Sequence, residues 1–502
     1  MTTLVGRPGM AGVARGSAAN LAGAVVAAAS TFVLTVVVTR GLSPSDAGVF
    51  FSVTSLFLVG MSLSQLGTDA GLVYFVSRAR ALGSLGDVGG LVRSAVLPVA
   101  GTGLLVAGAG TVLAADLGAL TNPGHAEEAT SLIRSVVWFI PLAGLETVAL
   151  AATRGLGTMR PSALTEQVAR PSLQLLLVTV AVSTAGPDLA ALAWGAAYLP
   201  AAAMAWLWWR RLWGALDRSA DPGPVGGQAR EFWTFTAPRS VASVAQLLMQ
   251  RLDIVLVGAL AGASQAALYA AATRFVVAGQ MGRQAVSLAA QPALAAALAR
   301  EDTDRARQVF QVSAAWLMAV TWPLFLTFAV VGGPLLHVFG PTYEAGADVL
   351  QLLSLAMLVA TACGDVDNAL IMAGKTTWSL ANMAVALTLN LGLDLWLIPG
   401  HGVLGAAIGW SVAIVVKNLL ALVQVWFALD LHPFGSGTLR VALLALATFG
   451  VVPWLCSRLV GTDLSGLLIG LAAAATCYLA GLYAWRRLLE LDSLLDRGRR
   501  SG

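Results

Sequence analysis

Apolar runs about as long as a membrane-spanning helix recur along almost the whole chain. They lie at about 18–39, 48–77, 95–115, 131–152, 162–184, 189–209, 232–259, 266–290, 309–331, 347–372, 379–398, 403–428, 441–457 and 464–485. A helix needs roughly 20 apolar residues to cross a bilayer, so the runs predict about fourteen transmembrane helices. Only 11% of the residues are charged, whereas a soluble domain carries about a quarter. The predicted fold class is therefore an all-α polytopic membrane protein.

The basic residues between these runs gather on one side of the predicted membrane. With the N-terminus placed in the cytoplasm, that side contains Arg78, Arg80, Arg93, Arg154, Arg160, Arg210, Arg211, Arg218, Arg230, Arg300, Arg305, Arg307, Lys375, Arg486, Arg487, Arg497, Arg499 and Arg500. The opposite loops contain little that is basic beyond Arg40 and Arg458. Because basic loops stay in the cytoplasm, we expect a multi-pass protein of the cell (cytoplasmic, inner) membrane with both termini cytoplasmic. The first run is too long for the apolar region of an export signal, so we expect it to be retained as a span.

Two pairs of segments repeat at a common offset. VVVTRGLSPSDAGVFF (36–51) aligns loosely with VLVGALAGASQAALYA (255–270), and ATRGLGTMRPSAL (152–164) aligns with IMAGKTTWSLAN (371–382), which places Gly157 opposite Gly374. The offset equals about six helices, and an even-numbered repeat produces two lobes of the same topology. The chain is therefore predicted to form two six-helix lobes with pseudo-two-fold symmetry. The predicted domains are an N-terminal lobe (1–215), a C-terminal lobe (216–435), and two extra helices with a basic cytoplasmic tail (436–502).

Several of these segments resemble a known family of transporters. The carriers of the resemblance are TRGLSPSDAGVFFSVTSLFLVGMSLSQLGTDAGLVYFVSR (39–78), ATRGLGTMR (152–160) and QRLDIVLVGALAGASQAALYAAATR (250–274). In this order they are similar to bacterial polysaccharide flippases of the O-antigen (Wzx-like) type. That family belongs to the multidrug/oligosaccharidyl-lipid/polysaccharide exporter superfamily. The resemblance covers about residues 18–430 and implies that two lobes rock about a central cavity, moving a lipid-linked oligosaccharide outward by alternating access.

Charged side chains inside the predicted spans are the candidate functional residues. The predicted substrate-binding cations are Arg239, Arg251, Arg274, Arg283 and Lys417. Four of them fall in the runs 232–259 and 266–290, which contain a single acid, Asp253. Charges retained at membrane depth usually face a bundle interior or a water-filled cavity. Because guanidinium groups pair bidentately with phosphate oxygens, a cationic cavity would suit a phosphate- or pyrophosphate-bearing substrate.

Two of these cations also have structural interpretations. Arg239 lies in the cytoplasmic third of its span, so its side chain could extend to the membrane surface. Lys417 lies near the midpoint of a span, where an unpaired lysine is costly. It would therefore either pair with an acid of another helix, such as Asp69 or Asp253, or face the substrate path.

The acids in the spans have similar alternatives. Asp69 follows a glycine in QLGTDAG and is expected at a break in the second helix, where a carboxylate can bind a coupling proton or sodium ion. The alternative is a carboxylate that hydrogen-bonds the backbone of a kink. Asp253 is the second possible ion-coupling residue. Glu166 and Arg170 are four residues apart, which predicts an intrahelical ion pair, and Asp394 is expected to extend to the membrane surface from a span end.

The sequence favours a transporter over an enzyme. The four histidines are scattered and the three cysteines lie in or beside apolar runs, so we expect no catalytic residue, metal site, cofactor or nucleic-acid partner. The expected partners are a lipid-linked oligosaccharide, membrane lipids, a coupling proton or sodium ion, and polysaccharide assembly machinery. An ion-coupled drug antiporter of the same superfamily and a flippase of the peptidoglycan lipid precursor remain alternatives. A polysaccharide polymerase or ligase would need a large outward-facing catalytic loop, which no stretch between the runs could form.

Overall fold

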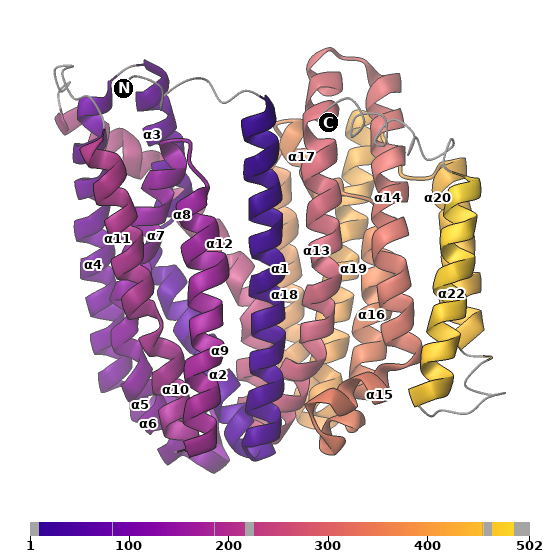
Figure 1. The fold of residues 1–502 in the computed structure, drawn as a ribbon, viewed down its shortest axis with the longest axis horizontal. Coiled ribbons are helices and arrows are strands. Elements are labelled where there is room, and N and C mark those ends of the chain that lie inside the picture. Colours follow the sequence, from indigo (N-terminus) through magenta and orange to yellow (C-terminus); the bar gives the residue numbers. More distant parts are fainter. Residues whose placement is uncertain are drawn as a thin grey trace. The chain divides into compact units, whose positions relative to one another are not determined.

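The protein is described by a computed structural model that covers residues 10–82, 84–184, 186–215, 225–453, 455 and 464–485. In this part of the chain every regular element is a helix. The helices group into two compact units, Met1–Ala267 and Leu268–Gly502. In each unit the long helices run side by side along a shared direction (Figure 1). The predicted basic tail from Arg486 onward lies outside the described residues.

The first unit contains the elements up to the beginning of α13. Its helices are α1 (Met10–Gly41), α2 (Pro44–Gln65), α3 (Thr68–Leu82), η1 (Leu85–Asp87), α4 (Val88–Val112), α5 (Ala114–Thr121), η2 (Pro123–His125), α6 (Ala126–Val136), η3 (Val137–Phe139), α7 (Ile140–Gly155), α8 (Arg160–Ser162), the π-helix η4 (Ala163–Ala169), α9 (Arg170–Thr184), α10 (Pro187–Ala196), α11 (Tyr198–Gly214) and α12 (Val225–Ala261). A core that includes Leu72, Val76, Val92, Ala149 and Phe232 joins α3, α4, α7 and α12.

The second unit contains the remaining elements. Its helices are most of α13 (Ala263–Ala299), α14 (Thr303–Val330), α15 (Gly332–Leu336), η5 (His337–Phe339), η6 (Pro341–Gly346), α16 (Ala347–Ala362), α17 (Val366–Met372), α18 (Thr376–His401), α19 (Val403–Leu429), α20 (Ser436–Ala445), the π-helix η7 (Leu446–Val451) and α22 (Leu464–Ala484). Its core includes Phe310, Val366, Leu370 and Val425.

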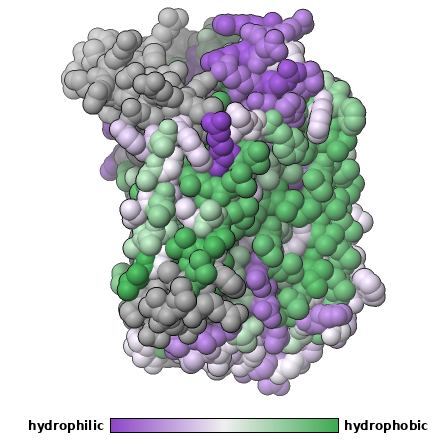
Figure 2. Space-filling view, turned by 90° about the vertical axis from the view of Figure 1, so that its right-hand side faces the viewer, coloured by the Kyte–Doolittle hydropathy of each residue, from purple (hydrophilic) through white to green (hydrophobic). Residues whose placement is uncertain are grey.

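Ten described helical segments are long and apolar enough to cross a membrane, and shorter apolar helices lie at Ala289–Ala299, Ser436–Val451 and Ile469–Ala484. Figure 2 shows one face of the molecule, on which hydrophobic residues fill a broad middle zone between hydrophilic ends. Helices occupy the described part of each of the fourteen predicted runs. The all-helical, many-span class is therefore confirmed, whereas the count of fourteen stays a prediction.

The second predicted helix is broken at the expected position. Ser43 caps the N-terminus of α2, because its hydroxyl accepts a hydrogen bond from the Asp46 N–H at 3.2 Å and so satisfies a free donor of the first turn. The helix ends where Leu66 (φ 51) and Gly67 (φ 69) adopt left-handed conformations. A helix cannot continue through two left-handed residues, because its hydrogen bonds require right-handed dihedrals. Asp69 consequently lies in the first turn of a new helix, α3.

The order of elements agrees with the predicted repeat. In the first unit a long helix (α1) and a short turn precede α2, and α12 likewise precedes α13 through a short turn. The aligned glycines Gly157 and Gly374 both adopt a left-handed conformation, with φ of 81° and 74°. Both end a helix, at α7 and α17 respectively, before the next helix begins. The same local geometry thus recurs at the aligned positions.

α12 packs in the first compact unit, although the repeat assigns it to the second lobe. α12 falls within the predicted C-terminal lobe, yet it packs along α2 and α3 inside the first compact unit. Small residues permit the close approach, because a Cβ at Gly258 would lie 2.8 Å from the Ser52 hydroxyl and 2.9 Å from the Thr121 carbonyl oxygen. The lobe boundaries at 215 and 435 remain a prediction.

Candidate functional site

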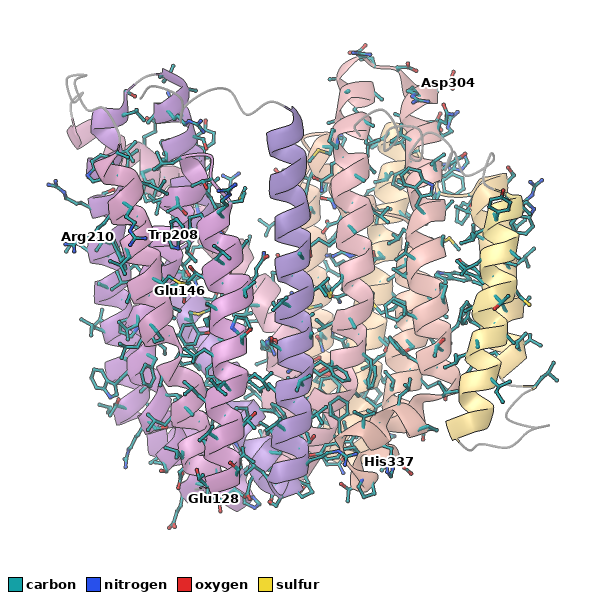
Figure 3. All side chains as sticks on the ribbon, viewed as in Figure 1. Glu128, Glu146, Trp208, Arg210, Asp304 and His337 are labelled. Atoms are coloured by element: carbon teal, nitrogen blue, oxygen red, sulfur yellow. The ribbon has the colours of Figure 1, made fainter. Side chains whose placement is uncertain are left out.

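A buried ion pair occupies the interior of the first unit. Arg170, at the start of α9, donates to Glu146 of α7 at 3.1 Å, and the guanidinium carbon of Arg170 lies 5.0 Å from the centre of the Tyr198 ring. Glu146 is only 1% exposed. In Figure 3 it lies inside the helix bundle, about midway along it, whereas Glu128 lies at one end of the unit. A carboxylate at this depth requires a cation, because burial of a lone charge is strongly unfavourable.

A second cluster lies around the break between α2 and α3. Arg154, near the end of α7, pairs with Asp69 and also with Glu166 at 3.4 Å. The predicted intrahelical pair between Glu166 and Arg170 is therefore wrong. The segment Ala163–Ala169 is a π-helix, whose i→i+5 bonding rotates side chains four apart away from a common face. Each of the two residues instead pairs with a residue of α7.

Arg251, a predicted substrate-binding cation, lies on α12 in the same unit. It is within electrostatic reach of Tyr198, which is also the neighbour of the pair formed by Arg170 and Glu146. Its Nε is buried and has no hydrogen-bond partner, and no acid within the described ranges forms an ion pair with it. Asp253, two residues further along α12, is buried. An intramembrane guanidinium without an acid retains its capacity to bind an anion.

Arg239 lies three helical turns before Arg251 on α12. Its guanidinium carbon is 4.0 Å from the centre of the Phe235 ring, and the side chain is exposed. It lines a groove of about 680 Å³ between α3 and α12, together with Asp69, Tyr74 and other residues of these two helices. Across the described part of the chain, Arg239 forms no ion pair with an acid. Two predicted site residues, Arg239 and Asp69, thus share one groove.

In the second unit two predicted cations are paired with acids. Lys417 of α19 lies 3.2 Å from Asp367, and Arg283 of α13 lies 3.6 Å from Asp365. Asp365 also accepts hydrogen bonds from Ser287 and from Asn368. The two sequence alternatives for Lys417 were pairing and exposure to the substrate path. Lys417 contacts an acid of another helix, as the pairing alternative states, but that acid is Asp367 and not Asp69 or Asp253.

In the first unit, the contact that corresponds to the ion pair of Arg283 and Asp365 is uncharged. Gln65 donates to the hydroxyl of Thr147 at 3.0 Å, and these two residues precede Arg283 and Asp365 by the offset of the repeat. The same contact is therefore a neutral hydrogen bond in one unit and an ion pair in the other. Arg274, the remaining predicted cation, lies half-buried on α13 in the second unit.

A polar seam between α18 and α19 was not predicted from the sequence. Asn382 and Gln424 exchange two amide hydrogen bonds at 2.7 and 2.9 Å, and Asn390 donates to Asp394 at 2.8 Å. Asp394 is 0% exposed, so the prediction that it extends to the membrane surface is wrong. The signal was present in the spacing, since residues 382, 390 and 394 share one helix face.

Comparison with known proteins places these features in a family. The profile of the family described as "Polysaccharide biosynthesis protein" matches residues 13–298, and the MatE profile matches residues 238–396. The probable flippase AglR of Haloferax volcanii is 25% identical over 240 residues, 45% of this chain and 48% of that protein. The match therefore spans about half the length of this curated relative.

Solved structures share the fold at low sequence identity. The lipid II flippase MurJ in an inward closed conformation has a TM-score of 0.73 at 13% identity, covering 95% of this chain and 100% of that one. An inward-facing MATE multidrug transporter of the MOP superfamily has a TM-score of 0.65 at 14% identity, covering 83% and 95%. The resemblance to flippases of this superfamily is thereby confirmed at the level of family and fold. Because a family profile matches more than half of its residues, the chain belongs to the polysaccharide biosynthesis protein family.

Proposed function

We propose that this chain is a flippase without enzymatic activity. It moves a lipid-linked oligosaccharide with an anionic, polyprenyl-diphosphate-type head from the inner to the outer leaflet of the cell membrane by alternating access. The transported lipid serves cell-surface polysaccharide biosynthesis, and both termini lie in the cytoplasm. Membership of the polysaccharide biosynthesis family and the fold shared with known transporters support the proposal.

The observation that carries the proposal is Arg251. It is a cation on a membrane-length helix, with a buried Nε and no ion pair to an acid in the part of the chain described. Lys417 and Arg283 are each balanced by an aspartate. A phosphate that reaches Arg251 would form charge-assisted, bidentate hydrogen bonds in a medium of low dielectric constant, where they are strongest.

Ion coupling is the second part of the proposal. Asp69 and Asp253 remain the candidate residues, and a proton or sodium ion would drive the cycle. Asp69 supports this role because its helix break brings it to Arg154, which also contacts Glu166. Protonation of Asp69 or Glu166 would change the net charge of the cluster that these two acids form with Arg154.

Arg251 also discriminates between this substrate and one of two alternative substrates. A cationic drug would be repelled by a guanidinium that no acid neutralises, so Arg251 disfavours the antiporter. The peptidoglycan lipid precursor carries a diphosphate too, and Arg251 would bind it equally well. Family membership favours the polysaccharide precursor of the two.

The test is the identity of the lipid that accumulates without the protein. Cells that lack the chain should accumulate a lipid-linked oligosaccharide on the inner leaflet, and the wild-type chain should clear it. Arg251→Gln should reduce export roughly tenfold or more, because a charge-assisted hydrogen bond contributes about 1.5–3 kcal/mol. Arg210→Gln, which changes an exposed arginine of the first unit (Figure 3), is the matched control and should export normally. Full export by Arg251→Gln at wild-type protein levels would overturn the proposal.

A further inference from the structure

The groove between α3 and α12 combines a cation with an exposed aromatic surface. α3 contributes Tyr74 and Ser77, and α12 contributes Phe235 and Arg239. Its volume of about 680 Å³ falls in the range of roughly 300–1,000 Å³ found for small-ligand sites. Both helices belong to the first compact unit, so the groove is formed within a single packed body.

Three of these side chains form one stacked column. The rings of Tyr74 and Phe235 are stacked, with centres 4.6 Å apart and an angle of 18° between their planes. Arg239 covers Phe235 with its guanidinium carbon 4.0 Å from the ring centre. A cation–π contact is an electrostatic attraction to the ring face and not a hydrogen bond, so it orients Arg239 and leaves its N–H donors available.

Arg239 is the groove cation that no acid neutralises among the described residues. Arg78 at one end of the groove pairs with Glu231 at 2.6 Å, and Asp69 at the other pairs with Arg154. These pairs cancel four of the nearby charges. Among the charged residues that line the groove, Arg239 is thus the one without an ion pair to an acid in the described chain, and it would attract a negatively charged group.

The aromatic part of the column is open as well. Tyr74 is 48% exposed and lies on α3, within the helical segment Pro44–Leu82 that is long and apolar enough to cross a membrane. An exposed aromatic ring beside an arginine that no acid neutralises suits a sugar phosphate, because sugar C–H groups pack on aromatic rings while hydroxyls bond to polar neighbours such as Ser77. An anionic glycolipid head carries both groups in adjacent positions.

We infer that this groove is a loading site that binds the phosphate and the first sugar of the lipid-linked substrate before it reaches Arg251. Arg239 holds the phosphate, and Tyr74 supports the sugar ring. The groove runs along α3 from Asp69 to Arg78, toward the end that the arginine distribution predicts to be cytoplasmic, where a substrate of the inner leaflet would arrive. The inference rests on the proposed function and adds a second, separable binding step.

The experiment measures binding to the purified full-length chain in lipid nanodiscs. The probes are a polyprenyl diphosphate carrying one sugar and, separately, phosphatidylglycerol, which shares the lipid phosphate but has no sugar. Arg239→Gln should weaken binding of the glycolipid roughly ten- to hundredfold, the loss expected for charge-assisted hydrogen bonds. Arg239→Lys, which keeps the charge but not the fork, should bind with intermediate affinity. Arg230→Gln on the same helix lies outside the groove and should bind as the wild type does.

The outcomes separate the loading site from the proposed function. Wild-type glycolipid affinity in Arg239→Gln, with affinity lost in Arg251→Gln, would overturn the loading site and leave the flippase proposal standing. Equal losses for glycolipid and phosphatidylglycerol would instead assign the groove to ordinary membrane phospholipid. A wild-type chain that binds no glycolipid would remove both proposals. Unchanged helix content and elution volume of each variant exclude misfolding as the cause.

Discussion

Inside the helix bundles, the energetic cost of each cation depends on whether an acid lies close enough to form an ion pair with it. Arg170 has Glu146 at 3.1 Å and Lys417 has Asp367 at 3.2 Å, so removal of either acid would leave a buried positive charge. Such a loss is more costly than the net contribution of the pair itself, because the remaining ion stays desolvated. Arg251 has a buried Nε and no ion pair to an acid among the described residues, which is why we propose that it binds an anionic substrate.

Glu146→Gln should destabilise the protein strongly. Glu146 is buried against Arg170, and breaking a buried pair costs about 3–5 kcal/mol. The thermal unfolding midpoint of the purified variant should therefore fall by several degrees. Glu128→Gln removes the same charge from an exposed site and should change stability by less than about 0.5 kcal/mol. Equal midpoints for the two variants would contradict a structural role of Glu146.

Lys417 and Asp367 should behave as a coupled pair. Lys417→Met and Asp367→Asn should each lower stability, whereas the double variant should recover part of the loss, with a coupling of roughly 0.5–3 kcal/mol. If Lys417 serves only this pair, the double variant should also export polysaccharide. Stable protein without export would show instead that the lysine contacts the substrate.

At the scale of elements, close helix contacts depend on residues without side chains. α2 and α12 approach each other at Gly258, where the Ser52 hydroxyl and the Thr121 carbonyl occupy the space of a Cβ. In α4, by contrast, a Cβ at Gly108 would meet nothing within 4 Å. Glycine is therefore needed for close packing at position 258 but not at position 108, and only the tertiary contacts distinguish the two positions.

Gly258→Ala should loosen the packing of α12 on α2. The added methyl group overlaps backbone and hydroxyl oxygens, and overpacking of this kind costs about 1–3 kcal/mol. Gly108→Ala should be neutral or stabilising by up to about 1 kcal/mol, because alanine is the better helix former. Thermal unfolding of the two variants, compared with wild type, measures the difference. A Gly258→Ala variant as stable as Gly108→Ala would exclude the close contact.

At the scale of the whole molecule, the distribution of arginine predicts the orientation in the membrane. Glu128, in the first turn of α6, and Asp304, in the first turn of α14, are exposed and are predicted to lie on opposite sides of the membrane. In a variant without the three native cysteines, Glu128→Cys should react with a membrane-impermeant thiol reagent added to intact cells. Asp304→Cys should react only after the membrane is permeabilised. The reverse pattern would contradict the predicted topology.

Much of the fold could be predicted because it depends on local sequence. Helix length follows from the length of an apolar run, and the break before Asp69 follows from the glycine in QLGTDAG. The repeat was visible because aligned turns use the same left-handed glycines, Gly157 and Gly374. Each of these features is a property of residues that are neighbours in the chain.

The pairing of charges could not be predicted, because the partners lie on different helices. Arg170 and Glu166 have the spacing of an intrahelical pair, but a π-helix changes their register and each contacts α7 instead. Asp394 lies near a span end, yet it faces the α18–α19 seam and is buried.

The sequence by itself determined the membrane class, the helical runs and the number of charges that must be accommodated among them. Only the tertiary structure decided which of those charges form ion pairs, and with which residues. The physical reason is that Coulomb energy in a medium of low dielectric constant depends steeply on the separation of side chains, which helix packing alone sets. By this criterion Lys417 and Arg283 are neutralised, whereas Arg239 and Arg251 form no ion pair with an acid in the described chain.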